Sequence, residues 1–202
     1  MEVTYVQEAY NNIASSFSST RYRPWSCVER FLSEIESGSK VADIGCGNGK
    51  NMQYRMDCDF EGCDFSQKLV DICKEKGLNV VFGDILHVPF EDETFDYTIC
   101  VAVLHHLFGE KNKRQAISEL KRITKKNGKI FILVWAFEQE ANSKRQFSRQ
   151  DNMIPWKDKK QNIIAWRYYH LFRKDEFSEL LEDEAVDIFF ERSNWGAVLQ
   201  NK

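Results

Sequence analysis

A glycine-rich turn directly after a short apolar segment is the feature that most constrains the fold of this chain. Residues Lys40–Ile44 predict a buried strand, and the sequence GCGNG follows at Gly45–Gly49. Glycines at this spacing permit a tight turn and let a ligand approach the backbone closely, and the helix expected next supplies a helix N-terminus. The sequence therefore predicts an α/β fold with a ligand site at this turn.

Strand and helix patterns alternate along the rest of the chain. Such alternation indicates a parallel sheet that helices cover on both faces. The expected helices lie at Ser66–Lys76, Glu110–Lys126 and Lys174–Glu182. The seven expected strands lie at Lys40–Ile44, Phe60–Cys63, Asn79–Phe82, Asp96–Val101, Lys129–Trp135, Val186–Phe190 and Gly196–Gln200.

The 202 residues suggest one domain with modest additions. Residues 1–38 are expected to form an N-terminal helical cap, with one helix over residues 5–18 and a second that follows Pro24 and is closed by Gly38. Residues 39–135 are the expected ligand-binding core. Residues 136–173 lack a clear period and exceed a usual connection, which indicates a substrate loop or lid. Residues 174–202 supply the last helix and strands.

Composition limits the class of protein. The longest apolar run, Ile130–Phe137, is far shorter than the roughly 20 residues that a membrane helix needs, and the N-terminus has no secretion-signal pattern. The six cysteines form no CxxC pair, which favours reduced thiols, no metal site and a cytoplasmic location. The net charge is only −3, but residues 111–129 and 144–174 are rich in lysine and arginine. These two blocks are expected either to bind phosphate groups or to be ordinary solvated faces.

Three acidic residues follow three successive predicted strands. Asp43 precedes the glycine turn, Asp64 ends the second strand and Asp84 follows the third. The carboxyl ends of parallel strands are where open sheets bind ligands. The turn has the spacing GxGxG rather than GxGxxG, and an acid beside it would repel a pyrophosphate but suit ammonium and sulfonium groups. The pattern favours S-adenosylmethionine over NAD, with Asp64 facing the ribose hydroxyls and Asp84 the adenine amino group.

Residues 40–135 resemble the class I S-adenosylmethionine-dependent methyltransferases, which implies a Rossmann-like, mostly parallel sheet of seven strands. From Tyr10 to Val198, further segments resemble the eukaryotic tRNA wobble-uridine carboxymethyl methyltransferases, which esterify 5-carboxymethyluridine at the wobble position. The segments that carry the second resemblance are Tyr10–Ala14, Thr20–Trp25, Ala102–His106, Val134–Gln139, Ile154–Trp156, Arg167–Phe172 and Glu191–Trp195.

The resemblance implies a set of site residues. A carboxylate substrate is already ionised at neutral pH, so no general base is required, and cationic or hydrogen-bonding groups should lie near the methyl group. The expected catalytic residues are His105, His106, Arg21 and Trp135. The expected cofactor-binding residues are Asp43, Gly45, Cys46, Gly47, Asn48, Gly49, Asp64, Phe65, Asp84, Ile85 and Val101. The expected substrate-binding residues are Tyr22, Arg23, Trp25, Arg167, Tyr168, Tyr169, His170, Arg192, Asn194 and Trp195, with Trp156 as a further aromatic candidate.

The resemblance also implies two partners. One is the tRNA anticodon stem–loop, and the other is a small zinc-binding activator subunit that extends the sheet at the third strand. The short apolar segment Asn79–Phe82 would otherwise be an exposed edge, unless a loop covers it. Three other interpretations stay open: a small-molecule methyltransferase acting on a quinone or sterol precursor, a catalytically silent RNA-binding subunit, and an NAD oxidoreductase.

Overall fold

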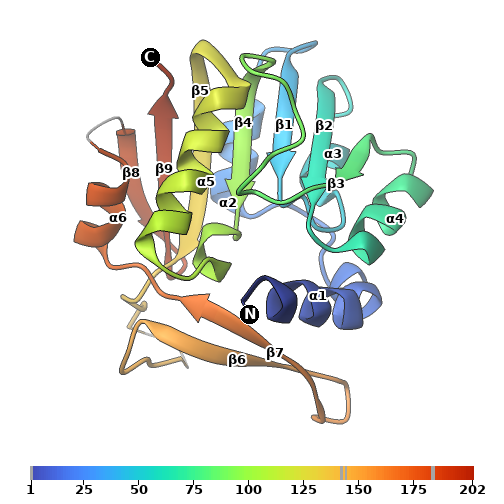
Figure 1. Cartoon of the computed structure of the whole chain (residues 1–202), viewed down its shortest axis with the longest axis vertical. Coiled ribbons are helices and arrows are strands. Elements are labelled where there is room, and N and C mark those ends of the chain that lie inside the picture. The colour runs from blue at the N-terminus through green and yellow to red at the C-terminus, as the bar shows by residue number, and fades with distance from the viewer. Residues whose placement is uncertain (1, 142, 144, 183–184) are drawn as a thin grey trace.

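A seven-stranded sheet forms the centre of the computed structural model, which describes residues 2–141, 143, 145–182 and 185–202. The strand order is β3-β2-β1-β4-β5-β9-β8 (Figure 1). The pairs from β3 to β5 are parallel, and β9 runs antiparallel to both of its neighbours. This confirms the predicted mostly parallel sheet. The strands are β1 (Lys40–Ile44), β2 (Asp59–Asp64), β3 (Val80–Phe82), β4 (Phe95–Val101), β5 (Thr124–Trp135), β8 (Ala185–Glu191) and β9 (Asn194–Gln200).

Alternating side chains build a separate apolar cluster on each face of the sheet. On β5, Ile130 and Ile132 join the cluster that contains the helices α5 (Glu110–Ile123) and α6 (Lys174–Leu180). Phe131 and Leu133, which alternate with them along the strand, join the cluster on the opposite face. A central strand that is apolar on both faces is typical of a parallel sheet covered on two sides. The helices of the opposite face are α2 (Ser26–Ser33), α3 (Lys50–Tyr54) and α4 (Gln67–Glu75).

Two helices end at least three residues earlier than predicted. The helix α5 stops at Ile123, because Thr124 takes an extended conformation and its Oγ1 donates to the carbonyl oxygen of Leu120 (2.7 Å). The helix α2 ends at Ser33, and Gly38, expected to close it, lies outside the helix with φ at +83°. Because α5 ends early, β5 begins at Thr124 instead of the predicted Lys129, and neither change moves the glycine turn.

The structure bears on the state of the cysteines, on membrane-spanning helices and on metal sites. All six cysteines are free, and five of them are buried. Of the helices in the described ranges, none is both long and apolar enough to cross a membrane. The same residues hold no group of three or more His, Cys, Asp or Glu side chains arranged to bind a metal ion.

The segment 136–173, predicted as an aperiodic loop or lid, contains an antiparallel hairpin instead. Its strands are β6 (Asp151–Lys157) and β7 (Ile163–His170). The two-residue period of β7 is hard to see in the sequence because each face mixes polar and apolar side chains. The buried face carries Arg167 and Tyr169, while Trp166 is exposed. In Figure 1 the hairpin crosses below the carboxyl ends of the strands, with α1 (Glu2–Ser18) beside it, so it forms a wall at that end of the sheet.

Candidate active site

A cavity of about 420 Å³ lies at the carboxyl ends of the parallel strands. One end is lined by the glycine turn and by the residues that follow β2 and β3. The other end is lined by α1, the 3₁₀ turn η1 (Leu104–His106), the end of β5 and the β6–β7 hairpin. Figure 1 shows these elements gathered at the same end of the sheet. One cavity therefore extends from the glycine turn to the hairpin.

The glycine turn is held in a conformation that other residues rarely adopt. Gly45 has φ at +73°, and a Cβ atom added there would overlap the side chain of Val103. Gly47 has φ at +59°, and its N–H donates to Oδ2 of Asp64 (2.8 Å). Glycine has no steric penalty at positive φ, so the turn can stay tight and leave its backbone open to the cavity.

Asp43 is fully buried behind the turn and has incomplete hydrogen bonding. Its Oδ2 accepts from Nδ2 of Asn51 (3.2 Å), whereas its Oδ1 and the Oδ1 of Asn51 have no partner. Burial raises the pKa of the Asp43 carboxyl to about 7, and the Asn51 bond and the charge of Lys50 offset only part of this effect. Asn51 also lines the cavity. Two buried acceptors without donors fit a ligand that brings N–H donors and positive charge, as an ammonium group does.

Asp64 and Asp84 lie at the ends of β2 and β3, as predicted. Asp64 accepts from the backbone N–H groups of Gly47 and Ser66 (both 2.8 Å), and burial nonetheless raises its pKa to about 6. Asp84 accepts from the backbone N–H of Leu86 (3.0 Å). Both carboxyl groups line the cavity, where they could accept hydrogen bonds from hydroxyl and amino groups of a ligand.

Most of the predicted cofactor-binding residues line this cavity, and their contacts with a cofactor stay predictions. Asp43 and Gly49 do not line it: Asp43 lies behind the turn, and Gly49 precedes α3 with φ at +74°. Those that line the cavity are Gly45, Cys46, Gly47, Asn48, Asp64, Phe65, Asp84, Ile85 and Val101.

At the hairpin end, two arginines face one aromatic ring. The guanidinium carbons of Arg21 and Arg167 each lie 5.0 Å from the ring centre of Trp156. Arg167 is buried on β7; its Nη1 donates to the hydroxyl of Tyr169 (2.9 Å), but its Nε has no partner. Burial lowers the pKa of Arg21, and the charge of Arg167 acts in the same direction. Two confined cations and one unpaired buried donor favour an anionic ligand at this end.

The two histidines of η1 are neutral, unlike the cationic groups considered for the site. Nδ1 of His106 donates to the carbonyl oxygen of Tyr168 (2.7 Å), which leaves Nε2 to accept from the hydroxyl of Tyr10 (2.9 Å). Burial lowers the pKa of His106 to about 4. His106 lines the cavity and holds the Tyr10 ring beside it.

His105 does not line the cavity, and its expected role in positioning the substrate stays a prediction. It is fully buried, and its Nδ1 accepts the backbone N–H of Trp135 (3.2 Å). Its ring stacks on Tyr169 at 4.6 Å. Burial lowers the pKa of His105 well below its ordinary value. His105 therefore supports Trp135 and Tyr169, and both of those residues do line the cavity.

Two residues predicted to bind substrate lie on the surface after α1. Tyr22 is exposed, and Arg23 is exposed and pairs with Glu29 (3.1 Å). Neither lines the cavity, and their expected contact with the substrate stays a prediction. The chain brings Arg21 and Trp25, on either side of them, to the cavity instead.

Three further predicted residues lie in the turn between β8 and β9 or at the start of β9, outside the cavity lining. Arg192 has φ at +50°, and its carbonyl oxygen accepts from Nδ2 of Asn194 (2.8 Å). Trp195 is buried, and its Nε1 donates to Glu138 (2.8 Å). The Oδ1 of Asn194 is buried without a partner, and the expectation that this segment binds substrate stays a prediction.

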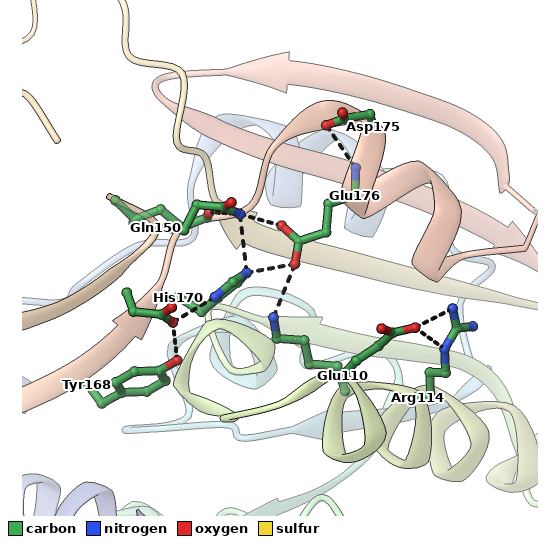
Figure 2. A network of polar contacts seen from close by, with 10 residues as sticks. Glu110, Arg114, Gln150, Tyr168, His170, Asp175 and Glu176 are labelled. Carbon is green, nitrogen blue, oxygen red and sulfur yellow. Dashed lines mark hydrogen bonds and ion pairs between the residues drawn. The ribbon is translucent and has the colours of Figure 1, made fainter. Parts of the chain in front are cut away.

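Tyr168 and His170 do not line the cavity either. They alternate along β7 with Arg167 and Tyr169, which face the cavity. They belong to a polar network at the base of the hairpin (Figure 2). The ring nitrogens of His170 contact Asp151 Oδ1 (2.9 Å) and Glu176 Oε1 (2.7 Å). The hydroxyl of Tyr168 donates to the same oxygen of Asp151.

The network continues from the hairpin into the body of the protein. Glu176, on α6, accepts from Nζ of Lys113 on α5 (3.2 Å) and from Nε2 of Gln150 (2.6 Å), as Figure 2 shows. Burial raises the pKa of Glu176, but its bonds with His170 and Lys113 outweigh burial and lower it to about 2. We call the residues Asp151, His170, Glu176, Gln150 and Lys113 the hairpin clasp, since they fasten the hairpin to two helices.

Many cavity residues were not predicted, among them Lys50, Asn51, Phe17 and Arg145. Lys50 and Asn51 follow the glycine turn directly, so their place in the first helical turn is a signal that could have found them. Burial lowers the pKa of Lys50 to about 8. Phe17 and Arg145 carry no local signal, because only the tertiary fold brings them to the cavity. Lys144, in the second basic block, lies outside the described residues.

Comparison with known proteins identifies the family. A model of the methyltransferase domain matches residues 42–132. The chain is 40% identical to the tRNA (carboxymethyluridine(34)-5-O)-methyltransferase of Schizosaccharomyces pombe, over 98% of this chain and 97% of that protein. The chain belongs to the tRNA (carboxymethyluridine(34)-5-O)-methyltransferase family. The relatives from Xenopus tropicalis (32% identical over 99% of this chain) and Arabidopsis thaliana (45% over 71%) are longer, and the chain spans 41% and 35% of them.

Solved structures share the fold at low identity. The CcbJ methyltransferase from Streptomyces caelestis matches with a TM-score of 0.76 at 10% identity and 98% coverage of both chains. A complex between the Haloferax volcanii Trm112 methyltransferase activator and a putative methyltransferase matches with a TM-score of 0.70 at 16% identity and 97% coverage of both chains.

The predictions of a class I methyltransferase fold, of the family and of S-adenosylmethionine as cofactor are confirmed. The unpartnered oxygens of Asp43 and Asn51 and the carboxyl groups of Asp64 and Asp84 fit this cofactor.

Proposed function

We propose that this chain transfers a methyl group from S-adenosylmethionine to the carboxylate of 5-carboxymethyluridine at the tRNA wobble position, giving the methyl ester. The observation that carries the proposal is the unpaired, buried Nε of Arg167, at the opposite end of the cavity from the glycine turn. A substrate carboxylate would supply the missing acceptor. Membership of the family supports the same substrate.

The residues of the cavity are suited to a reaction that needs no base. Bound S-adenosylmethionine supplies an electrophilic methyl group on a positively charged sulfur. The substrate carboxylate is ionised at neutral pH, so the enzyme has no proton to remove. This agrees with His106, whose one accepting nitrogen already receives the Tyr10 hydroxyl. The work left to the protein is alignment and charge compensation.

Arg167 is placed to hold one carboxylate oxygen. Its Nη1 is engaged by the hydroxyl of Tyr169, and its Nε is the nitrogen left without an acceptor. A single hydrogen bond to one oxygen would orient the carboxylate and leave the other oxygen free to attack. Arg21, on the same side of the cavity, adds a second positive charge without a tight pair.

Aromatic side chains are placed to hold the uracil ring. Trp156 is fixed by a hydrogen bond from its Nε1 to Oγ of Ser16 (3.0 Å), and Trp135 lies 4.4 Å from Tyr169, centre to centre. All three aromatic residues line the cavity. Enzymes that act on a base commonly take it out of its stack and hold it against such rings.

The test is methyl transfer from labelled S-adenosylmethionine to tRNA that carries 5-carboxymethyluridine. Wild-type protein should give a base-labile label, as expected for an ester. Arg167→Ala should lose transfer and keep cofactor binding, and Arg167→Lys should recover part of it. Arg30→Ala, which removes an exposed arginine on α2, is the matched control and should behave as wild type. Cofactor binding without transfer to this tRNA in the wild type would instead favour a small-molecule substrate.

A small zinc-binding activator is the partner that we propose for the β3 edge. β3 is an edge strand, and Val81 and Phe82 on it are exposed. An exposed apolar edge strand is prone to pair with another chain. The Haloferax volcanii complex offers a protein of the same fold bound to an activator. Val81→Asp should abolish co-purification with a co-expressed activator, whereas Val186→Asp, on the opposite edge strand β8, should not; the reverse result would contradict this placement.

We propose a cytoplasmic site of action. The six free cysteines suit a reducing compartment. A fluorescent fusion of the chain that accumulates in an organelle would contradict this proposal.

A further inference from the structure

The outward face of the β6–β7 hairpin presents large apolar side chains to solvent. Met153, Ile164 and Trp166 are 45%, 44% and 48% exposed. Ile164 and Trp166 are two residues apart on β7 and therefore share a face, and Met153 pairs across the hairpin with Tyr168 on that same face. Single exposed apolar residues are common, but neighbours on one face of a two-stranded sheet indicate a binding surface. We call this surface the hairpin outer face.

Positive charge borders the hairpin outer face. Lys157, Lys159 and Lys160 are exposed at the tip of the hairpin. The acidic residue among them, Asp158, is occupied within the turn: its carboxylate accepts from the backbone N–H groups of Lys160 and Asn162 (both 2.8 Å). An aromatic ring bordered by lysines is the arrangement that binds single-stranded nucleic acid, with the base on the ring and the phosphates beside the cations.

The hairpin outer face continues into the cavity. Pro155 pairs across the hairpin with Trp166, and Pro155 and Lys157 both line the cavity. A nucleotide held in the cavity would therefore have its chain neighbours close to Trp166 and the lysines of the tip.

We propose that the hairpin outer face binds the nucleotides that flank the target in a single-stranded RNA loop, with Trp166 stacking on one base. This inference rests on the proposed function and adds a second contact surface to it. The three exposed lysines favour RNA over a protein partner. An apolar protein surface would leave their charges without partners, whereas RNA phosphates would pair with them. The arrangement reads no base edge, so binding should tolerate different flanking bases.

The test uses the full chain, together with its activator if that is needed for solubility, and an anticodon stem–loop RNA with unmodified uridine at the wobble position. Trp166→Ala should weaken binding of this RNA at least about fivefold, the low end expected for loss of one stacked base, and Trp166→Phe should restore most of it. Met56→Ala removes another exposed apolar side chain, between α3 and β2, and should bind as wild type. S-adenosylmethionine affinity should be unchanged in all three variants.

A second variant guards against an effect of Trp166 on hairpin folding. Lys159→Glu combined with Lys160→Glu changes only exposed side chains and should weaken RNA binding and flatten its salt dependence. Unchanged RNA binding in Trp166→Ala would overturn the proposal, and so would loss of activator binding in place of RNA binding. Because the probe RNA cannot be methylated, this result is independent of whether 5-carboxymethyluridine is the substrate.

Discussion

Replacing Asp43 with asparagine should abolish cofactor binding and yet stabilise the cofactor-free protein at neutral pH. Burial raises the pKa of the Asp43 carboxyl from an ordinary 3.8 to about 7. Between these values the unfolded chain has lost the proton while the folded chain keeps it. The free energy of unfolding of the wild type must therefore fall as the pH rises through this window. Asparagine cannot ionise, so the variant lacks this loss.

The size of the effect follows from the same two values. The difference between about 7 and 3.8 is about 3.2, and each pH unit corresponds to ~1.4 kcal/mol, so ionised Asp43 costs the folded apoprotein up to about 4 kcal/mol at pH 8. At pH 5 the cost is only about 1.6 kcal/mol, because the pH has crossed just about 1.2 units of this window. The negative charge that destabilises the empty site is the charge that a bound ammonium group would compensate.

The assay is urea unfolding of cofactor-free wild type and Asp43→Asn at pH 5 and pH 8, with calorimetric titration of S-adenosylmethionine at pH 8. The variant should gain about 4 kcal/mol over wild type at pH 8 and less than half of that at pH 5, and it should show no cofactor binding. Asp71→Asn, which removes an exposed carboxylate on α4, controls for net charge and should change neither quantity. Wild-type affinity in Asp43→Asn, or an equal stability difference at both pH values, would refute the reasoning.

Three further predictions use the same kinds of measurement. Gly45→Ala should abolish cofactor binding in calorimetry, whereas Gly77→Ala, with a similar φ but nothing near the added Cβ, should only lower the free energy of unfolding by about 1 kcal/mol. Glu176→Gln should lower the free energy of unfolding by about 1–2 kcal/mol and expose β7 amides to hydrogen exchange, while Glu110→Gln, in an exposed pair, should cost less than about 0.5 kcal/mol. Wild-type affinity for S-adenosylmethionine should fall as the pH drops below about 7, because Asp43 must release its proton; a flat profile from pH 8 to 6 would contradict this.

The part of the fold that sequence patterns could predict is the part set by local periodicity. The seven strands of the main sheet and the turn at Gly45–Gly49 each carry a continuous apolar run or a glycine signature, and the structure has them within a few residues. The end of α5 was predicted less accurately. The predicted helix continued to Lys126, because the residues there have a helical composition, but the structure has Thr124 in an extended conformation. Part of the site could also be predicted from the sequence. The carboxyl groups at strand ends were found because the ends of parallel strands meet at one edge of the sheet, however the helices pack.

The substrate side could not be found in this way, because adjacency in sequence misleads on a strand. The segment Arg167–His170 reads as one functional unit, yet its residues alternate between the cavity and the opposite face. Local patterns also give no information on pairing with distant residues. Nothing in the sequence near His105 indicates that its nitrogen is used by the backbone of Trp135, thirty residues away.

The alternation along β7 explains why the hairpin clasp matters for the site. Arg167 can face the cavity with an unpaired Nε only if the register of β7 is fixed, because a slip of one residue would exchange it for Trp166 or Tyr168. An unpaired buried donor also costs free energy, so the isolated hairpin would relax to satisfy it. His170, directly after the inward-facing Tyr169, is held by carboxylates from both β6 and α6 and resists this relaxation. The clasp thus keeps one face of β7 ready for an anion and the other available for a base.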